Sequence, residues 1–191
     1  MRAVVRARYA AHCVGYLLHS AAMNLYDATV PVFTKMLTNL LGWLDKAETA
    51  GQSKNYDPNV LLQQRFAPNQ WALVRQIQAA CDGAKWCCSK MTGKDAPAHP
   101  DTETTIAELR VRVKAVVEYI NTFTRADFEN CAERPCTHAW MGGKTLRATD
   151  YLDHYALPNF YFHYAHAYAM LRHAGIELGK SDYLGALPFS V

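Results

Sequence analysis

The sequence lacks several features that would point to a particular class of protein. It has no dense stripe of lysine and arginine, and its formal net charge of +3 is small, so nothing indicates a nucleic-acid partner. No apolar run approaches the roughly 20 residues that a membrane-spanning helix needs, so we expect no membrane association. Internal repeats and low-complexity segments are also missing. What is present is a chain of 191 residues, half of them apolar, which is typical of one ordinary globular domain.

The six cysteines include no CxxC pair, which argues against a zinc site built from thiolates. Cys131 and Cys136 lie in an expected loop, where they could close a small disulfide. Small oxidised domains usually show denser and more regular cysteine spacing. We therefore favour reduced thiols in a cytoplasmic protein.

Residues 1–22 contain arginines but no acidic residue. Such a segment resembles an organellar presequence or a weak secretory signal, and it is equally consistent with translation that truly begins at Met23. An organellar location is accordingly the alternative to the cytoplasm. We treat residues 1–22 as an extension and residues 23–191 as the domain.

Three stretches repeat apolar residues at spacings of three and four, which indicates amphipathic helices. The first is expected from Thr29 and Pro31 to about Gly51, the second from Pro68 to about Met91, and the third from a cap at Thr102. Their apolar stripes are Phe33, Leu37, Leu40, Leu44 and Ala47; Leu73, Ile77, Ala80, Ala84 and Cys88; and Ile106, Leu109, Val113, Val116 and Ile120.

A hairpin and a fourth helix are expected after these. Two glycines in residues 141–144 separate the short runs 137–140 and 145–148, which predicts a small β-hairpin. The fourth helix is expected from a cap at Thr149 to Gly175, interrupted by Pro158. Together these elements predict an all-α four-helix bundle with a small β-hairpin before the last helix.

The last helix is the best candidate for a functional site, because it holds four of the eight histidines. On a helical wheel Asn159, His163 and His166 share one face, and a spacing of four lets two side chains bind one ligand or metal ion. The second helix offers Gln78 and Asp82 as facing partners. A histidine among aromatic residues is more often a hydrogen-bonded core residue, so a structural role is the alternative. The many aromatic residues of this helix cannot all share one stripe, which suggests a homodimer face.

Three stretches resemble a known family: MNLYDATVPVFTKMLTNL from Met23, RFAPNQWALVRQIQAACD from Arg65, and residues 150–185, which include ALPNFYFH. They are similar to the domain of unknown function nineteen ninety-three, within the DinB-like superfamily. The resemblance implies a dimeric four-helix bundle with a long crossover. Many DinB-like relatives hold a metal on three histidines, one on the second helix and an HxxxH pair on the last. Some are metal-dependent thiol transferases or hydrolases.

Aligned with that pattern, His163 keeps the second histidine of the pair and Asn159 replaces the first. The second-helix ligand falls near Gln78 to Asp82, where the chain has no histidine. We therefore favour a bundle that binds an unknown small molecule at Asn159, His163, Gln78, Asp82 and His166. The alternatives are a metal-dependent transferase or hydrolase, with zinc or nickel on His163 and Asp82, and a purely structural dimer. Whether the protein is an enzyme stays open.

Overall fold

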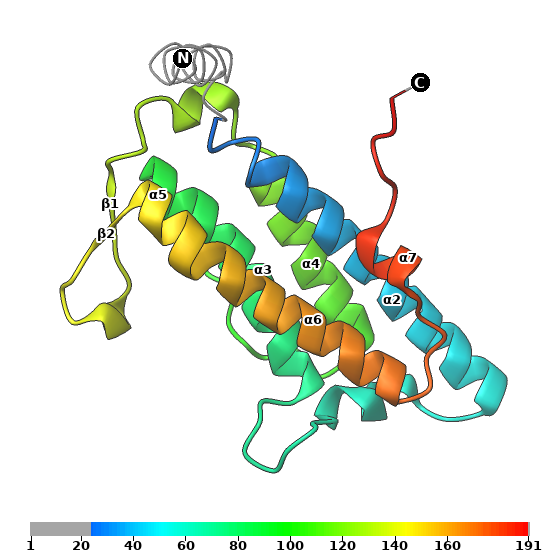
Figure 1. Cartoon of the computed structure of the whole chain (residues 1–191). Helices are drawn as coiled ribbons and strands as arrows, with labels where there is room; N and C mark the ends of the chain where they lie inside the picture. Colours follow the sequence, from blue (N-terminus) through cyan, green and yellow to red (C-terminus); the bar gives the residue numbers. More distant parts are fainter. Residues whose placement is uncertain (1–23, 191) are drawn as a thin grey trace, which may run out of the picture.

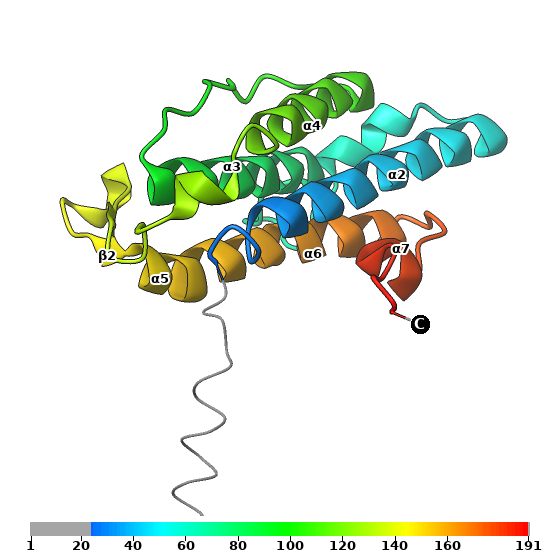
Figure 2. The same cartoon turned by 90° about the horizontal axis from the view of Figure 1, so that it is seen from above.

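The computed structural model describes residues 24–190, and in this part of the chain four long helices pack side by side (Figure 1). They are α2 (Val30–Lys54), α3 (Leu73–Thr92), α4 (Ile106–Ile120) and α6 (Leu157–His173). α3 and α4 run in the same direction, so residues 93–105 form a long crossover between them, while α2 and α6 run the opposite way (Figures 1 and 2). The expected all-α bundle with a crossover is confirmed. The extension at residues 1–22 lies outside the described residues.

The apolar stripe of α2 lies at the centre of the core. As its periodicity predicts, its members Phe33, Leu37, Leu40, Leu44 and Ala47 are fully buried. The expected end at Gly51 is wrong, because the helix continues to Lys54 and Asn55 closes it in the left-handed conformation. Gly51 has another role: a Cβ there would lie 2.9 Å from Pro58 in the 3-10 turn η1 (Pro58–Gln63).

Both expected starts of α3 and α4 are corrected. α3 begins at Leu73 instead of Pro68, because the preceding loop folds back and the Leu73 amide donates to the carbonyl of Gln64 at 2.9 Å. α4 begins after Thr105 instead of Thr102. The Thr105 hydroxyl accepts from the Glu108 amide at 3.2 Å, and the Glu108 carboxylate accepts from the Thr105 amide at 3.0 Å. This reciprocal capping box requires a glutamate three residues after the cap, which Thr105 has.

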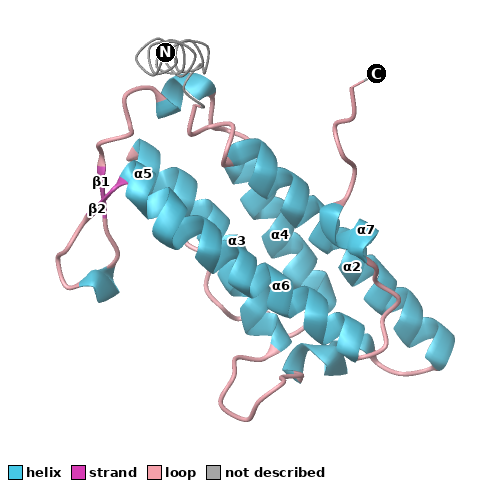
Figure 3. Cartoon of the chain, viewed as in Figure 1, coloured by secondary structure: helices cyan, strands magenta, loops and turns pink. Residues whose placement is uncertain are grey.

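The expected hairpin is present but shorter than predicted (Figure 3). β1 (Pro135–Cys136) and β2 (Leu146–Arg147) are antiparallel, with Pro135 opposite Arg147 and Cys136 opposite Leu146. The predicted strands at 137–140 and 145–148 are wrong in extent. Residues Ala139–Met141 coil into a 3-10 turn (η3), and Ala148 already belongs to the next helix.

The last helix starts as α5 (Ala148–Tyr151), one residue before the expected cap at Thr149. It widens into a π turn at Leu152–Ala156 and continues as α6. Pro158 explains the widening, because proline has no N–H to donate and its ring clashes with the carbonyl four residues back in a regular α-helix. The expected interruption therefore takes the form of a π turn.

A short C-terminal helix, α7 (Lys180–Leu184), and the loop before it cover α2. The indole of Trp43, 1% exposed, donates to the carbonyl of Asp182 at 3.0 Å. Its ring also packs against Tyr164 and Tyr183. Within residues 24–190 no helix combines the length and apolar character that a membrane crossing requires.

Candidate functional site: a cleft between α3 and α6

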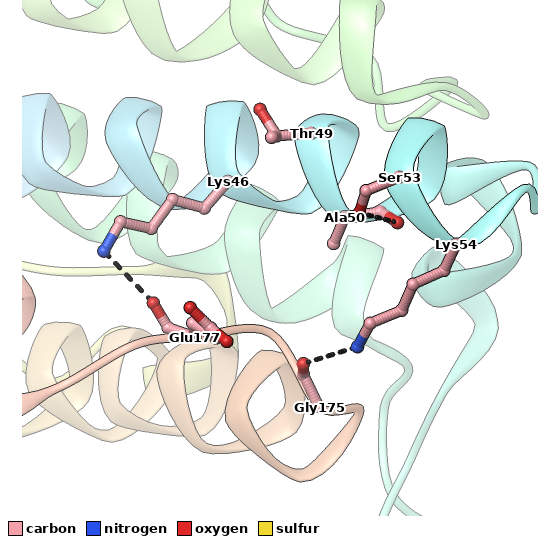
Figure 4. A pocket seen from close by; sticks show the side chains of 7 residues that line it. All are labelled: Lys46, Thr49, Ala50, Ser53, Lys54, Gly175 and Glu177. Carbon is pink, nitrogen blue, oxygen red and sulfur yellow. Dashed lines mark hydrogen bonds between the residues drawn. The ribbon is translucent and has the colours of Figure 1, made fainter.

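One hollow of about 280 Å³ lies between the C-terminal half of α2 and the segment after α6 (Figure 4). Two lysines reach across it. Lys46 Nζ donates to the carbonyl of Glu177 at 3.1 Å and to Asp182 at 2.7 Å, and Lys54 Nζ donates to the carbonyl of Gly175 at 3.4 Å. Because both ammonium groups hold the segment after α6 against α2, we assign this groove a structural role.

A second hollow, of about 260 Å³, lies along the contact between α3 and α6 and extends to the hairpin. We call it the α3–α6 cleft. Its aromatic lining consists of Trp71, Trp86, His138, Trp140, Tyr151 and Tyr155. Arg75, Asp82, Asn159 and His163 are its polar residues. Gly83 helps to make the space, since a Cβ there would lie 3.6 Å from the amide nitrogen of Asn159.

His163 is held in one orientation at one end of the cleft. It is 8% exposed, and its ring is nearly parallel to that of Trp71, with centroids 5.6 Å apart. Its Nδ1 lies 2.8 Å from Gln76 Oε1, while Gln76 Nε2 donates to the Trp71 carbonyl at 3.1 Å. Gln76 Oε1 can only accept, so His163 Nδ1 is the donor. Neutral His163 therefore presents Nε2 as an acceptor, and this atom has no hydrogen-bond partner among the described residues.

The cleft histidines are uncharged at neutral pH. Burial lowers the pKa of His163 to about 4, and His166 and Arg75 act in the same direction. At the hairpin end, burial and the charge of Lys90 lower the pKa of His138, whose Nε2 lies 2.8 Å from the Tyr151 hydroxyl. A base with so low a pKa is poorly matched to proton abstraction at pH 7. His163 Nε2 is therefore suited to accepting a hydrogen bond.

Asp82 lines the cleft but also belongs to a buried ion-pair network. Its Oδ1 accepts from Lys85 Nζ and from Arg112 Nη2, both at 2.9 Å. Arg112, whose side chain is 1% exposed, also pairs with Asp101 at 3.0 Å and Glu103 at 3.1 Å. These contacts fasten the crossover to α3 and α4. Asp82 is thus a structural residue with an exposed edge in the cleft.

The structure brings three of the five sequence-predicted site residues together: Asn159, His163 and Asp82. Gln78 does not line the cleft, because its amide binds Glu103 at 2.7 Å and Arg75 at 2.9 Å beneath the crossover. His166 does not line it either. Three residues beyond His163, it is rotated by about 60° around the helix axis, and its Nδ1 donates to the carbonyl of Phe162 at 2.6 Å. The expected common face of Asn159, His163 and His166 is therefore corrected at His166, and the expected facing partner Gln78 turns away from the cleft.

Comparison with known proteins identifies the family of this chain and a similar solved structure. The model of the family described as Domain of unknown function (DUF1993) matches residues 25–184. The chain belongs to the DUF1993 family. Among solved structures, it is similar to the crystal structure of a DinB family member protein from Shewanella denitrificans at 1.83 Å resolution, with 46% identity and a TM-score of 0.84. That match covers 87% of this chain and 95% of the other. No curated protein matches the sequence.

Most aromatic walls of this DUF1993 cleft were not among the sequence-predicted site residues. Trp71 precedes α3, and His138 and Trp140 lie in the hairpin, where helical periodicity carries no information. Helical spacing could have predicted Trp86, because it follows Asp82 by four residues and so lies on the same face of α3.

The donor atoms of the cleft do not fit the three-histidine metal set of DinB-like relatives. They comprise the free Nε2 of His163, the imidazole of His138, whose Nε2 already lies 2.8 Å from the Tyr151 hydroxyl, the neutral amide of Asn159 and a carboxylate whose Oδ1 two cations already share. Lys85 and Arg112 oppose a further positive charge beside Asp82. Across residues 24–190, no three His, Cys, Asp or Glu side chains gather in a way that could hold a metal ion.

Proposed function

We propose that this DUF1993 protein binds a small organic molecule in the α3–α6 cleft. The observation that carries the proposal is His163, whose Nδ1 is fixed by Gln76 while Nε2 is left as an unbonded acceptor in an aromatic-lined opening. Asn159 adds an amide that has no hydrogen-bond partner in the described part of the chain. An apolar cavity with a few convergent polar groups is the usual form of a small-molecule site. At about 260 Å³ the cleft lies just below the usual size range of such sites.

A fragment library screened by thermal shift, with calorimetry on the hits, tests this proposal. We expect hits whose affinity falls about fivefold or more in His163→Phe and Asn159→Leu, since one good hydrogen bond contributes about 1 kcal/mol. His166→Phe is the matched control, because it changes a histidine of the same helix that does not line the cleft. If no fragment binds, or if binding survives both cleft variants, the proposal fails.

The fixed tautomer of His163 is also what a metal-ligating histidine needs, so a metal-dependent transferase or hydrolase is the competing proposal. Elemental analysis of purified protein distinguishes the two. Our proposal expects far less than one zinc or nickel ion per chain. About one ion per chain in the wild type, lost in His163→Ala, would favour the enzyme. A dimer whose melting temperature no small molecule raises would instead favour a purely structural role.

A further inference from the structure

The α3–α6 cleft presents a large exposed ring toward each of its ends. Trp71, which stacks on His163, is 51% exposed. In the hairpin, Trp140 is 65% exposed and packs against Tyr155 with ring centroids 5.3 Å apart. Neighbouring side chains contact both rings, but half or more of each residue stays exposed, and exposed aromatic surface is where flat molecules stack. The cleft thus has two stacking stations, the Trp71 station and the Trp140 station.

The two stations are too far apart for one small ring. On the last helix, Tyr155 packs against Trp140 and His163 stacks on Trp71. These two residues are eight steps apart, which corresponds to about 12 Å at 1.5 Å per residue. Between the ends, Gly83 of α3 faces Asn159 of α6. A ligand that uses both stations must therefore be elongated and must pass the Asn159 amide.

The charges that line the cleft are already balanced. Arg75 pairs with Asp101, and Asp82 pairs with Lys85 and Arg112. Both cleft histidines have pKa values lowered by burial. A strongly charged ligand would therefore find no unpaired charge of opposite sign in the cleft. Asn159 can both donate and accept, which suits an amide or hydroxyl group in the middle of a ligand.

We propose that the ligand is an elongated, uncharged molecule with a flat aromatic ring near each end and an amide or hydroxyl group between them. This inference rests on the proposed function, since it names the ligand class of the same cleft. The two rings stack on Trp71 and on Trp140, and the central group binds Asn159.

Calorimetry with synthetic bis-indoles tests the inference. The probes carry two indole rings on uncharged diamide linkers of increasing length, and the reference probe carries one indole on the same linker. We expect the two-ring probe to bind about tenfold or more tightly than the one-ring probe, with a maximum where the rings are about 12 Å apart, because a linker that matches the span makes the second contact intramolecular.

Variants at each station separate the outcomes. Trp71→Leu and Trp140→Leu should each reduce the two-ring probe to the affinity of the one-ring probe. Phe66→Leu, which changes an exposed aromatic residue that does not line the cleft, should not reduce the affinity of the two-ring probe.

Equal binding of one-ring and two-ring probes would overturn the two stations and leave the proposed function standing. If neither probe binds while fragments of another class do, the ligand class is wrong. If no compound binds at all, the proposed function fails with it.

Discussion

At the scale of single residues, the burial of His163 makes stability depend on pH. Histidine titrates near pH 6.5 in the unfolded chain, whereas burial lowers the pKa of His163 to about 4 in the folded protein. Between these values the unfolded state binds more protons, so the free energy of unfolding falls as the pH drops from about 6.5 to about 4. The lowered pKa values of His138 and His99 act in the same direction.

We expect urea titrations at pH 7 and pH 4.5 to show this loss. The shift of His163 corresponds to at most about 3 kcal/mol, so His163→Gln should reduce the difference between the two pH values by about 1–3 kcal/mol. An unchanged difference in that variant would show that other groups cause the pH dependence.

Substitution of Arg112 tests how much the buried ion-pair network contributes to the free energy of unfolding. Arg112→Met removes a side chain that is 1% exposed and leaves Asp101 and Glu103 with fewer partners. Breaking a buried ion pair in this way typically costs about 3–5 kcal/mol. Arg147 is the matched control, because its side chain is 56% exposed and its pairs with Asp150 and Glu133 lie at the surface. Arg147→Met should cost less than about 1 kcal/mol. Chemical denaturation measures both, and similar losses would contradict the prediction.

At the scale of elements, substitutions of Thr105 and Thr102 test where α4 begins. Thr105→Ala removes the hydroxyl that caps α4 and should cost about 1 kcal/mol of unfolding free energy. Thr102→Ala should change stability by less than about 0.5 kcal/mol, because Thr102 is exposed and its hydroxyl makes no hydrogen bond within the described residues. A larger loss at Thr102 would mean that α4 starts earlier in solution.

These elements show what the sequence could predict. The stripe from Phe33 to Ala47 repeats at the helical period, so the existence and buried face of α2 followed directly. Helix ends were harder, since several threonines, glycines and prolines compete for each boundary and tertiary contacts decide among them. In the site, Asn159 and His163 followed from helical spacing. Gln78 was misplaced because a buried polar side chain can turn toward an ion network as readily as toward a cleft. Trp71 and Trp140 depend on loop conformations that spacing does not encode.

At the scale of the whole molecule, the thiols report on the integrity of the fold. The five cysteines in the described part are free and buried, and burial raises the pKa of Cys81 and Cys88 to about 12 and that of Cys136 to about 11. Because the thiolate is the reactive form, Ellman's reagent should label none of them in the native protein. Cys13 lies outside the described residues, so the measurement uses Cys13→Ser. We expect five thiols after denaturation, and a count of three would indicate a disulfide such as Cys131–Cys136.

The homodimer suggested by the aromatic residues of the last helix stays a prediction. Phe162 is 55% exposed on α6 and is the residue of that helix most suited to such a contact. Sedimentation velocity of the wild type and of Phe162→Ser tests it: we expect a dimer that dissociates in the variant. A monomeric wild type would contradict the prediction.

The distribution of tryptophan gives the molecule an optical property of its own. Three of its four tryptophans, Trp71, Trp86 and Trp140, line the cleft, whereas Trp43 is buried in the core. The ultraviolet emission of the folded protein is therefore the sum of a short-wavelength component from Trp43, shielded from dissolved quenchers, and a longer-wavelength component that acrylamide can reach. Occupancy of the cleft alters only the second component, so the protein carries an internal reference beside its own reporter and needs no attached dye.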